Sequence, residues 1–299
     1  MYHQPALLHE CIEGLCINPS GIYADLTFGG GGHSREILSK LNTGGRLIAF
    51  DQDEDSIENT LDDERFTLVN ENFRYLKNFL RLHKALPLDG ILADLGISSH
   101  QIDTPERGFA TRFEGPLDMR MGRNQGTTAA QMVNTYPEEK LQSVFKLYGE
   151  LSNARQLAAA IVHARTNPIT TTTELKEAIK TCLPSNYENK FLAQIFQAIR
   201  IEINDEMGAL QAMLKQCADV LKPGGRLVII SYHSLEDRLV KNYMKTGNFE
   251  GVQEKDFYGN IIAPLKPVTR KPITPEAHEL KSNPRSRSAK LRIAQKTEL

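Results

Sequence analysis

The chain has few cysteines, no long apolar run and almost no net charge. Its 299 residues carry a formal charge of −1. No apolar run approaches the roughly 20 residues that span a membrane, and the N-terminus lacks the basic-then-apolar pattern of a signal peptide. The cysteines form no C-x-x-C pair and no metal-ligand spacing; they are Cys11, Cys16, Cys182 and Cys217. We therefore expect reduced thiols, a cytoplasmic location and no membrane partner.

Acidic residues are absent from one stretch near the C-terminus. Between positions 281 and 296 all charged residues are basic: Lys281, Arg285, Arg287, Lys290, Arg292 and Lys296. A near-neutral protein with one basic segment favours local contact with a polyanion, although a solvated tail has the same composition. The alternation over residues 290–293 also fits a last strand with Leu291 and Ile293 inward, its basic residues facing outward. These interpretations stay open.

The glycine run 29–32 lacks the third glycine of a dinucleotide fingerprint. It joins an expected strand at 21–27 to an expected helix at 34–41, and the third glycine would fall on Ser34 or Arg35. A second strand at 46–50 ends in Asp51, where an acidic side chain can accept both ribose hydroxyls. An adenosine cofactor without phosphate, such as S-adenosylmethionine, fits this pattern better than a pyrophosphate. The alternative is a glycine loop that binds nothing.

The order of the predicted elements indicates an α/β fold with an insertion. Further strands are expected at 66–69, at 88–96 with Asp94 near its end, and at 226–231. The gap after the fourth strand is too long for one crossover and is largely helical in pattern. Within it we expect a helix capped by Thr135 with Pro137 first, and helices at 155–165, 173–179 and 191–220, the last broken near Asn204 and Gly208.

Several longer motifs match one known family. They are YHQP at 2–5, DLTFGGGGHS at 25–34, DLGISSHQ at 94–101, GPLDMRM at 115–121, FQAIRIEINDE at 196–206, SYHSLEDR at 231–238 and RSRSAKLR at 285–292. With these motifs the chain resembles the S-adenosylmethionine-dependent 16S rRNA cytosine-N4 methyltransferases of bacteria, often called RsmH or MraW. The motifs follow one another in order along nearly the whole chain, which makes the combination far more specific than the glycine run.

The resemblance implies a Rossmann-like class I methyltransferase sheet with an inserted all-helical domain. Residues 1–104 and 216–299 would bind S-adenosylmethionine, and residues 105–215 would recognise the substrate. The implied reaction methylates the exocyclic N4 of a cytidine near the decoding centre, so the partner would be 16S rRNA or the small ribosomal subunit. The implied cofactor-binding residues are Gly31, Gly32, His33, Asp51, Phe73, Asp94 and Gln101. Taken alone, Phe73 suggests a core aromatic residue and Gln101 a surface glutamine.

The residues that hold the cytosine amine are not identified by a motif. Many amino-methyltransferases carry a Pro-Pro-aromatic motif after strand four, whereas residues 94–97 here are Asp-Leu-Gly-Ile. A hydrogen-bond acceptor that also removes the proton of the amine would assist the reaction. By position or chemistry the candidates are Asp94, Ser98, Ser99, Asp118 and His233.

Most of these candidates have an ordinary structural alternative. Ser98 and Ser99 are suited to cap a helix, and His233 to line the sheet edge. Asp118 is suited to pair with Arg120 or Arg123. No metal is expected, since His233 and Glu236 alone make no ligand set.

Two other classes of protein share parts of this pattern. A nicotinamide-dependent oxidoreductase would have the same sheet and an acid at Asp51, but the broken fingerprint and the lack of a second dinucleotide-binding half disfavour it. A non-catalytic RNA-binding factor on an old cofactor fold would differ only in failing to transfer methyl groups. The sequence leaves the oligomeric state open, a homodimer included.

Overall fold

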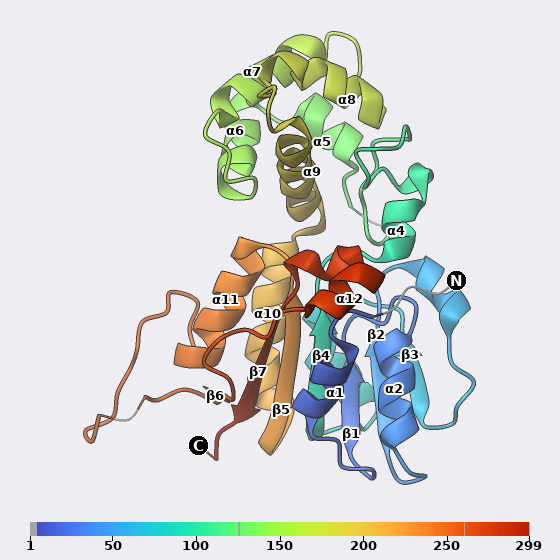
Figure 1. Cartoon of the computed structure of the whole chain (residues 1–299), viewed down its shortest axis with the longest axis vertical. Helices are drawn as coiled ribbons and strands as arrows, with labels where there is room; N and C mark the ends of the chain where they lie inside the picture. Colours follow the sequence, from blue (N-terminus) through green and yellow to red (C-terminus); the bar gives the residue numbers. More distant parts are fainter. Residues whose placement is uncertain (1–4, 125, 260, 299) are drawn as a thin grey trace. The chain divides into compact units, whose positions relative to one another are not determined.

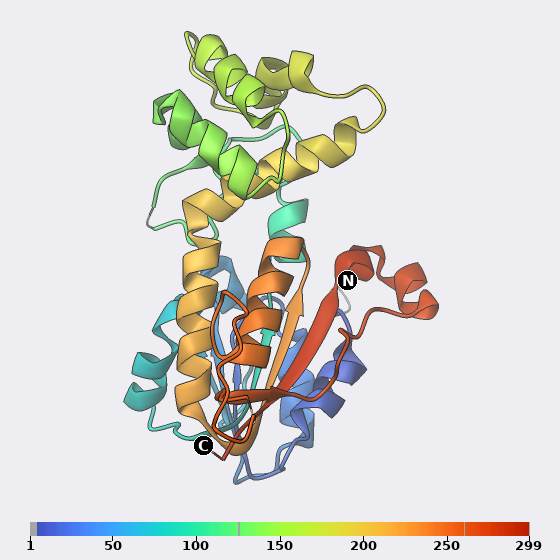
Figure 2. The same cartoon turned by 90° about the vertical axis from the view of Figure 1, so that its left-hand side faces the viewer.

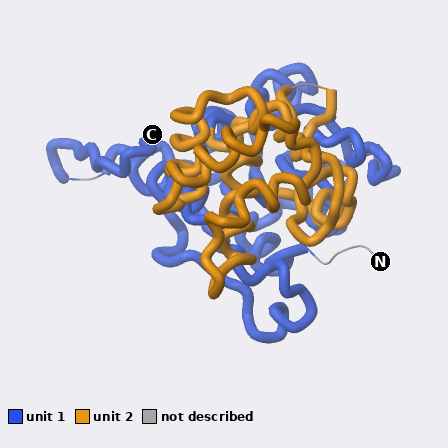
Figure 3. Tube along the Cα trace, turned by 90° about the horizontal axis from the view of Figure 1, so that it is seen from above, with its two compact units in different colours: residues 1–96, 208–299 blue, residues 97–207 orange. Residues whose placement is uncertain are grey.

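The computed structural model describes residues 5–124, 126–259 and 261–298. Tyr2, His3 and Gln4 of the first family motif lie outside these ranges. The chain divides into two compact units, unit 1 with residues 1–96 and 208–299 and unit 2 with residues 97–207 (Figures 1 and 3). The sequence had placed these boundaries at 104/105 and 215/216. The first unit boundary closely follows β4 (Leu88–Asp94), and the second lies near the start of α10 (Glu206–Val220), whose buried residues belong to the core of unit 1.

Unit 1 is built on a seven-stranded sheet with the order β3-β2-β1-β4-β5-β7-β6. Five neighbouring strands are parallel: β3 (Phe66–Val69), β2 (Arg46–Phe50), β1 (Ile22–Asp25), β4 and β5 (Leu221–Ser231). Two further strands complete the sheet: β7 (Lys290–Lys296) is antiparallel to β5, and β6 (Leu265–Pro267) is antiparallel to β7. The expected α/β class is confirmed. The strand order reverses between β1 and β4, and ligands of such sheets bind beside the carboxyl ends at this point.

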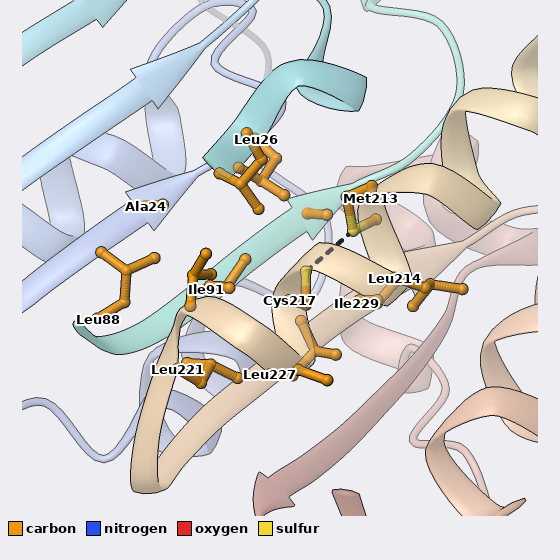
Figure 4. Packing of buried hydrophobic residues seen from close by; sticks show 14 of the residues in the cluster. Ala24, Leu26, Leu88, Ile91, Met213, Leu214, Cys217, Leu221, Leu227 and Ile229 are labelled. Atoms are coloured by element: carbon orange, nitrogen blue, oxygen red, sulfur yellow. Dashed lines mark hydrogen bonds between the residues drawn. The ribbon is translucent and has the colours of Figure 1, made fainter. Parts of the chain in front are cut away.

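Helices cover both faces of the unit 1 sheet (Figures 1 and 2). In β2, Leu47 and Ala49 pack with α1 (Leu8–Leu15) and α2 (Gly32–Lys40), while Ile48 and Phe50 pack with the opposite helices. These opposite helices are α3 (Leu76–Leu82), α10 (Glu206–Val220) and α11 (Ser234–Thr246). Figure 4 shows part of this second cluster, with side chains of β1, β4, β5 and α10 in one apolar layer. The doubly covered sheet explains the strongly apolar strands.

Short elements connect the strands and form the C-terminal part of unit 1. They are the 3₁₀ turns η1 (Glu54–Asn59), η2 (Phe73–Tyr75) and η5 (Pro284–Ser288), and the helix α12 (Ala277–Ser282). The expected last strand is confirmed as β7, with Leu291 and Ile293 buried.

Unit 2 is helical and has its own core. Its elements are α4 (Ser99–Asp103), η3 (Pro105–Arg107), α5 (Ala129–Thr135), α6 (Glu138–Leu147), α7 (Ala154–Ala164), α8 (Thr172–Ile179), η4 (Lys180–Cys182) and α9 (Glu188–Asn204). Leu141, Phe145, Leu157 and Ile195 lie in one buried cluster that joins α6, α7 and α9. In neither unit do the described residues include a helix of the length and apolarity needed to cross a membrane.

One predicted helix start was wrong. Thr135 is the last residue of α5 and does not cap α6, and Pro137 is the N-cap of α6, not its first residue. A residue before proline avoids helical geometry, so Tyr136 is extended and separates the two helices. The predicted break near Asn204 occurs at Asp205, whose φ of 47° ends α9. The predicted break near Gly208 is wrong, because α10 (Glu206–Val220) runs through this residue.

Candidate active site at the carboxyl ends of the strands

Three aspartates end neighbouring strands of unit 1. Asp25 is the last residue of β1, Asp51 follows β2 directly and Asp94 is the last residue of β4. Burial raises the pKa of all three carboxyls, that of Asp51 and that of Asp94 each to about 6. Parallel strands bring these groups to one edge, which is therefore acidic and suited to a ligand that carries positive charge.

Asp51 connects the glycine loop to the end of β2. Its Oδ2 accepts a hydrogen bond from the backbone N–H of Gly29 at 2.7 Å, and its Oδ1 accepts one from Asp53 N at 2.8 Å. The amide of Phe28 donates to the carbonyl of Phe50 at 2.9 Å, which extends the contact between loop and strand. The loop and its neighbouring acid, recognised separately in the sequence, are thus one structural element.

Gly31 and Gly32 are also required by the internal packing of the loop. Gly31 has a φ of 75°, and a Cβ there would lie 2.9 Å from the Phe28 ring. A Cβ on Gly32 would lie 2.2 Å from Cγ of Pro5. The predicted contact of these glycines with a cofactor stays a prediction, and the fold supplies a second reason for them.

His33 and Ser34 begin α2 with buried polar contacts. Ser34 Oγ donates to Oδ2 of Asp25 at 2.6 Å. The ring Nε2 of His33 lies 3.1 Å from the carbonyl oxygen of Ala6, so the histidine contacts the N-terminal segment. The sequence did not single out Asp25 or Ser34, although a carboxylate at the end of an apolar strand is a signal that was available.

Asp94 is hydrogen-bonded from two sides. Its backbone N–H donates to Oγ1 of Thr27 at 2.6 Å, and its Oδ1 accepts from the hydroxyl of Tyr232 at 2.8 Å. Burial is the main cause of its raised pKa, and the neighbouring His33 and the Tyr232 hydrogen bond act in the opposite direction. Sequence reasoning missed Tyr232, whose only signal is its position directly after β5.

Phe73 lies in η2, partly buried against the core of unit 1. The preceding residue, Asn72, donates from Nδ2 to Oε1 of Gln52 at 2.7 Å, which joins the segments after β3 and β2. Phe73 is therefore held near the same edge as Asp51. Its packing against adenine stays a prediction.

Four of the predicted site residues belong to unit 2, where they have structural roles. Ser98 is the N-cap of α4, and Gln101 completes its capping box by accepting from Ser98 N at 3.0 Å. Ser99 is the first residue of this helix. Asp118 binds Arg120 through two side-chain hydrogen bonds of 2.9 and 2.8 Å, and these bonds help to hold its pKa low. The capping of α4 and the Asp118–Arg120 pair are confirmed; the predicted contact of Gln101 with the cofactor stays untested.

His233 is the N-cap of α11 and forms a capping box with Glu236. Its Nδ1 accepts from Glu236 N at 3.4 Å, and Glu236 Oε2 accepts from Tyr232 N at 2.9 Å. The side chain is thus used to start a helix. Of the five catalytic candidates, Asp94 has the geometry best suited to proton transfer: a largely buried carboxylate whose pKa burial raises to about 6.

The fold and this edge define a doubly wound α/β protein with a glycine-lined, acidic site, typical of proteins that bind adenosine-containing cofactors. The family model of the MraW methylase family matches residues 1–297, and the chain belongs to this family of methyltransferases. It is 59% identical to the ribosomal RNA small subunit methyltransferase H of Flavobacterium johnsoniae over 99% of this chain and 98% of the relative. The protein of the same name from Bacteroides thetaiotaomicron is 58% identical over 99% and 97%.

Proposed function

We propose that the protein transfers a methyl group from S-adenosylmethionine to the exocyclic N4 of a cytidine in small-subunit ribosomal RNA. Membership of the MraW methylase family and the names of relatives at 58–59% identity support the reaction and the RNA class. The observation that carries the proposal is the gathering of the glycine loop, Asp51 and Asp94 at the carboxyl edge of one sheet. Such a reaction belongs in the cytoplasm, where ribosomal subunits are made.

The residues at this edge fit the proposed cofactor. Asp51 would accept the ribose hydroxyls, and the Gly31–Gly32 backbone would lie along the cofactor. The cofactor supplies an electrophilic methyl group on a positively charged sulfur. Its positive charges suit an edge with three carboxylates, and it has no phosphate that these would repel. The three carboxylates thus favour a sulfonium cofactor over a pyrophosphate cofactor.

Asp94 would act on the acceptor. The amine of cytosine is a weak nucleophile, because its lone pair is delocalised into the ring. Asp94 would accept a hydrogen bond from this amine and take its proton as the new nitrogen–carbon bond forms and the sulfur–carbon bond breaks. With a pKa of about 6, its carboxyl is ionised at neutral pH and is still a useful base. The proton then passes to solvent.

Basic side chains of the C-terminal part would contact the RNA backbone. Lys271, Lys281 and Arg287 are exposed, and the last two belong to the basic segment predicted from the sequence. Arg292 is not suited to this role, because its guanidinium donates to Asp237 at 2.6 and 3.2 Å. A test of phosphate contacts must therefore spare Arg292.

The triple variant Lys271→Ala, Lys281→Ala and Arg287→Ala should weaken RNA binding and flatten its salt dependence. Each lost phosphate contact lowers the slope of log K against log salt by about 0.7 for single-stranded RNA. Filter binding to small-subunit RNA over a range of salt concentrations measures this slope. An unchanged slope would show that these side chains do not contact phosphates.

Unit 2 would recognise the RNA around the modified nucleotide. It contains a pocket of about 310 Å³ whose lining includes Phe109, Phe196, Arg112, Arg200 and Gln197. Aromatic rings and guanidinium planes stack on unpaired bases, and an amide side chain can hydrogen-bond their edges. Arg112→Ala should therefore raise KM for RNA while kcat stays within about twofold, which steady-state kinetics would measure.

Methyl transfer from labelled S-adenosylmethionine to small subunits that lack the modification tests the proposal. We expect one methyl group per subunit, and Asp94→Asn should lower the rate at least a hundredfold, as loss of a general base does. RNA binding without transfer would favour a non-catalytic assembly factor. Saturable binding of NADH but not of S-adenosylmethionine would favour an oxidoreductase.

A further inference from the structure

Among the described residues, Tyr232 is the tyrosine whose hydroxyl donates a hydrogen bond to one of the three carboxylates of the site. Its hydroxyl lies 2.8 Å from Oδ1 of Asp94. The two residues stand at the ends of β4 and β5, which are paired in parallel, with Asp94 opposite Ile230. The contact joins neighbouring strands of unit 1, so the sheet itself fixes the distance between the phenol and the carboxylate.

The tyrosine is suited to remain a hydrogen-bond donor. Burial and the nearby Asp94 raise the pKa of the Tyr232 phenol well above its usual value, so it stays protonated at every pH used for an assay. Its own backbone N–H donates to Oε2 of Glu236 at 2.9 Å, which anchors this residue at the start of α11. A neutral donor held in this way can orient a carboxylate without competing for its proton.

The hydrogen bond uses part of the acceptor capacity of Asp94. An ionised carboxylate has about four lone-pair sites on two oxygens, so the bond at Oδ1 leaves room for a donor from a ligand. Four other titratable groups surround this carboxyl: His33 on α2, Asp25 at the end of β1, Glu236 on α11 and Cys11 on α1. Asp25 and Glu236 are acids that disfavour its ionisation, whereas burial and Asp94 raise the pKa of the Cys11 thiol, so that group stays neutral. Tyr232 and His33 oppose the two acids.

We propose that Tyr232 is a positioning residue for methyl transfer, which keeps Asp94 ionised and oriented toward the amine that it is to deprotonate. This inference rests on the proposed function. Tyr232 acts through Asp94 and forms no bond with the reacting atoms. Methyl transfer proceeds without it, but only at a pH high enough to ionise Asp94 unaided.

The test is the pH dependence of kcat/KM for small ribosomal subunits, measured from pH 5 to 9 at saturating S-adenosylmethionine. Saturation keeps Asp51 ionised, so that the acid limb reports Asp94. The wild-type limb should have its midpoint near pH 6, where the Asp94 pKa lies. A hydrogen bond to a charged group shifts a pKa by about one to two units, and Tyr232→Phe should raise the midpoint by that amount. The rate should then fall about tenfold at pH 6.5 and less than twofold at pH 9.

Two further variants separate positioning from a merely structural role. Tyr243→Phe is the matched control, because Tyr243 is buried in unit 1 and its ring stacks on Phe249 away from Asp94; its profile should be that of the wild type. Asp94→Asn should abolish the acid limb, and Tyr232→Phe should cost no further activity in that background.

Three results would overturn the inference. The first is that Tyr232→Phe lowers kcat/KM by the same factor at every pH. The second is that Tyr232→Phe lowers kcat/KM in the Asp94→Asn background as much as in the wild type. The third is that the acid limb persists in Asp94→Asn. The last applies even if Tyr232→Phe does not fold. A wild-type protein that transfers no methyl group at any pH would instead contradict the proposed function.

Discussion

Lowering the pH from 7 to 5 should weaken cofactor binding about tenfold through Asp51. Burial raises the pKa of this carboxyl from 3.8 to about 6 in the ligand-free protein. Ribose hydroxyls donate to the ionised form, so binding holds Asp51 ionised. Affinity should therefore be constant above about pH 6 and fall tenfold per unit below it, which gives roughly an elevenfold loss at pH 5.

The same raised pKa determines how the stability of the ligand-free protein changes with pH. Because the folded pKa is above the unfolded one, the contribution of Asp51 is fully present below 3.8 and is lost as the pH rises through about 6. The ligand-free fold thus carries a cost at neutral pH that the bound ribose would offset. Stabilisation by the cofactor should increase over this pH range.

Isothermal titration with S-adenosylhomocysteine between pH 5 and 8 measures the effect. This product lacks the sulfonium charge, which reduces the influence of the other carboxylates. Asp51→Asn should bind 10- to 100-fold more weakly at pH 7, since hydrogen bonds to a charged acceptor are lost, and should not show the Asp51 limb. A wild-type affinity that stays flat from pH 7 to 5, or a variant that titrates like the wild type, would refute the assignment of Asp51.

Three further predictions concern the packing around the site. Ser34→Ala removes the 2.6 Å hydrogen bond to buried Asp25 and should lower the free energy of unfolding by about 1.5–3 kcal/mol in urea titrations. Gly32→Ala places a Cβ 2.2 Å from Cγ of Pro5 and should cost about 1–3 kcal/mol in the same assay. Asp94→Asn removes a carboxyl whose pKa burial raises to about 6, so calorimetry should find it stabilising, by about 1 kcal/mol more at pH 7 than at pH 5.

Matched variants provide the controls for these three predictions. Ser39→Ala changes an exposed serine of the same helix and should alter stability by less than about 0.5 kcal/mol. At Gly44 a Cβ would approach Asn42 Oδ1 only to 3.3 Å, so Gly44→Ala should be milder than Gly32→Ala. Equal effects within either pair would contradict the packing argument, and a pH-independent effect of Asp94→Asn would contradict the raised pKa.

The sequence predicted the sheet well because its strands are buried on both faces. The predicted strands 46–50 and 66–69 have the same bounds as β2 and β3, because short, largely apolar runs bounded by polar residues mark where a strand begins and ends. The α1 helix was missed: it begins after Leu7 in a left-handed conformation without a side-chain cap, so no local signal marks its start. The Thr135 and Pro137 assignment failed because two helices follow one another closely.

The sequence predicted those residues of the candidate site that a local motif marks, and missed contacts between residues far apart in the chain. The glycine loop and Asp51 are local signals at strand ends, and Asp51 does contact the loop through Gly29. Tyr232 and its partner Asp94 are 138 positions apart, and only the pairing of β4 with β5 brings them together. The pairing of Asp118 with Arg120 was a local alternative that the sequence did offer, and it forms. The use of His233 as the N-cap of α11 was not predicted.

Mass mapping of small-subunit RNA tests the central claim most directly. Unmodified subunits treated with the protein and S-adenosylmethionine should gain one methyl group on the exocyclic nitrogen of a single cytidine, and Asp94→Asn should leave the same RNA unmodified over the same time. No added methyl group, or a methyl group on a ring carbon or on another base, would contradict the account.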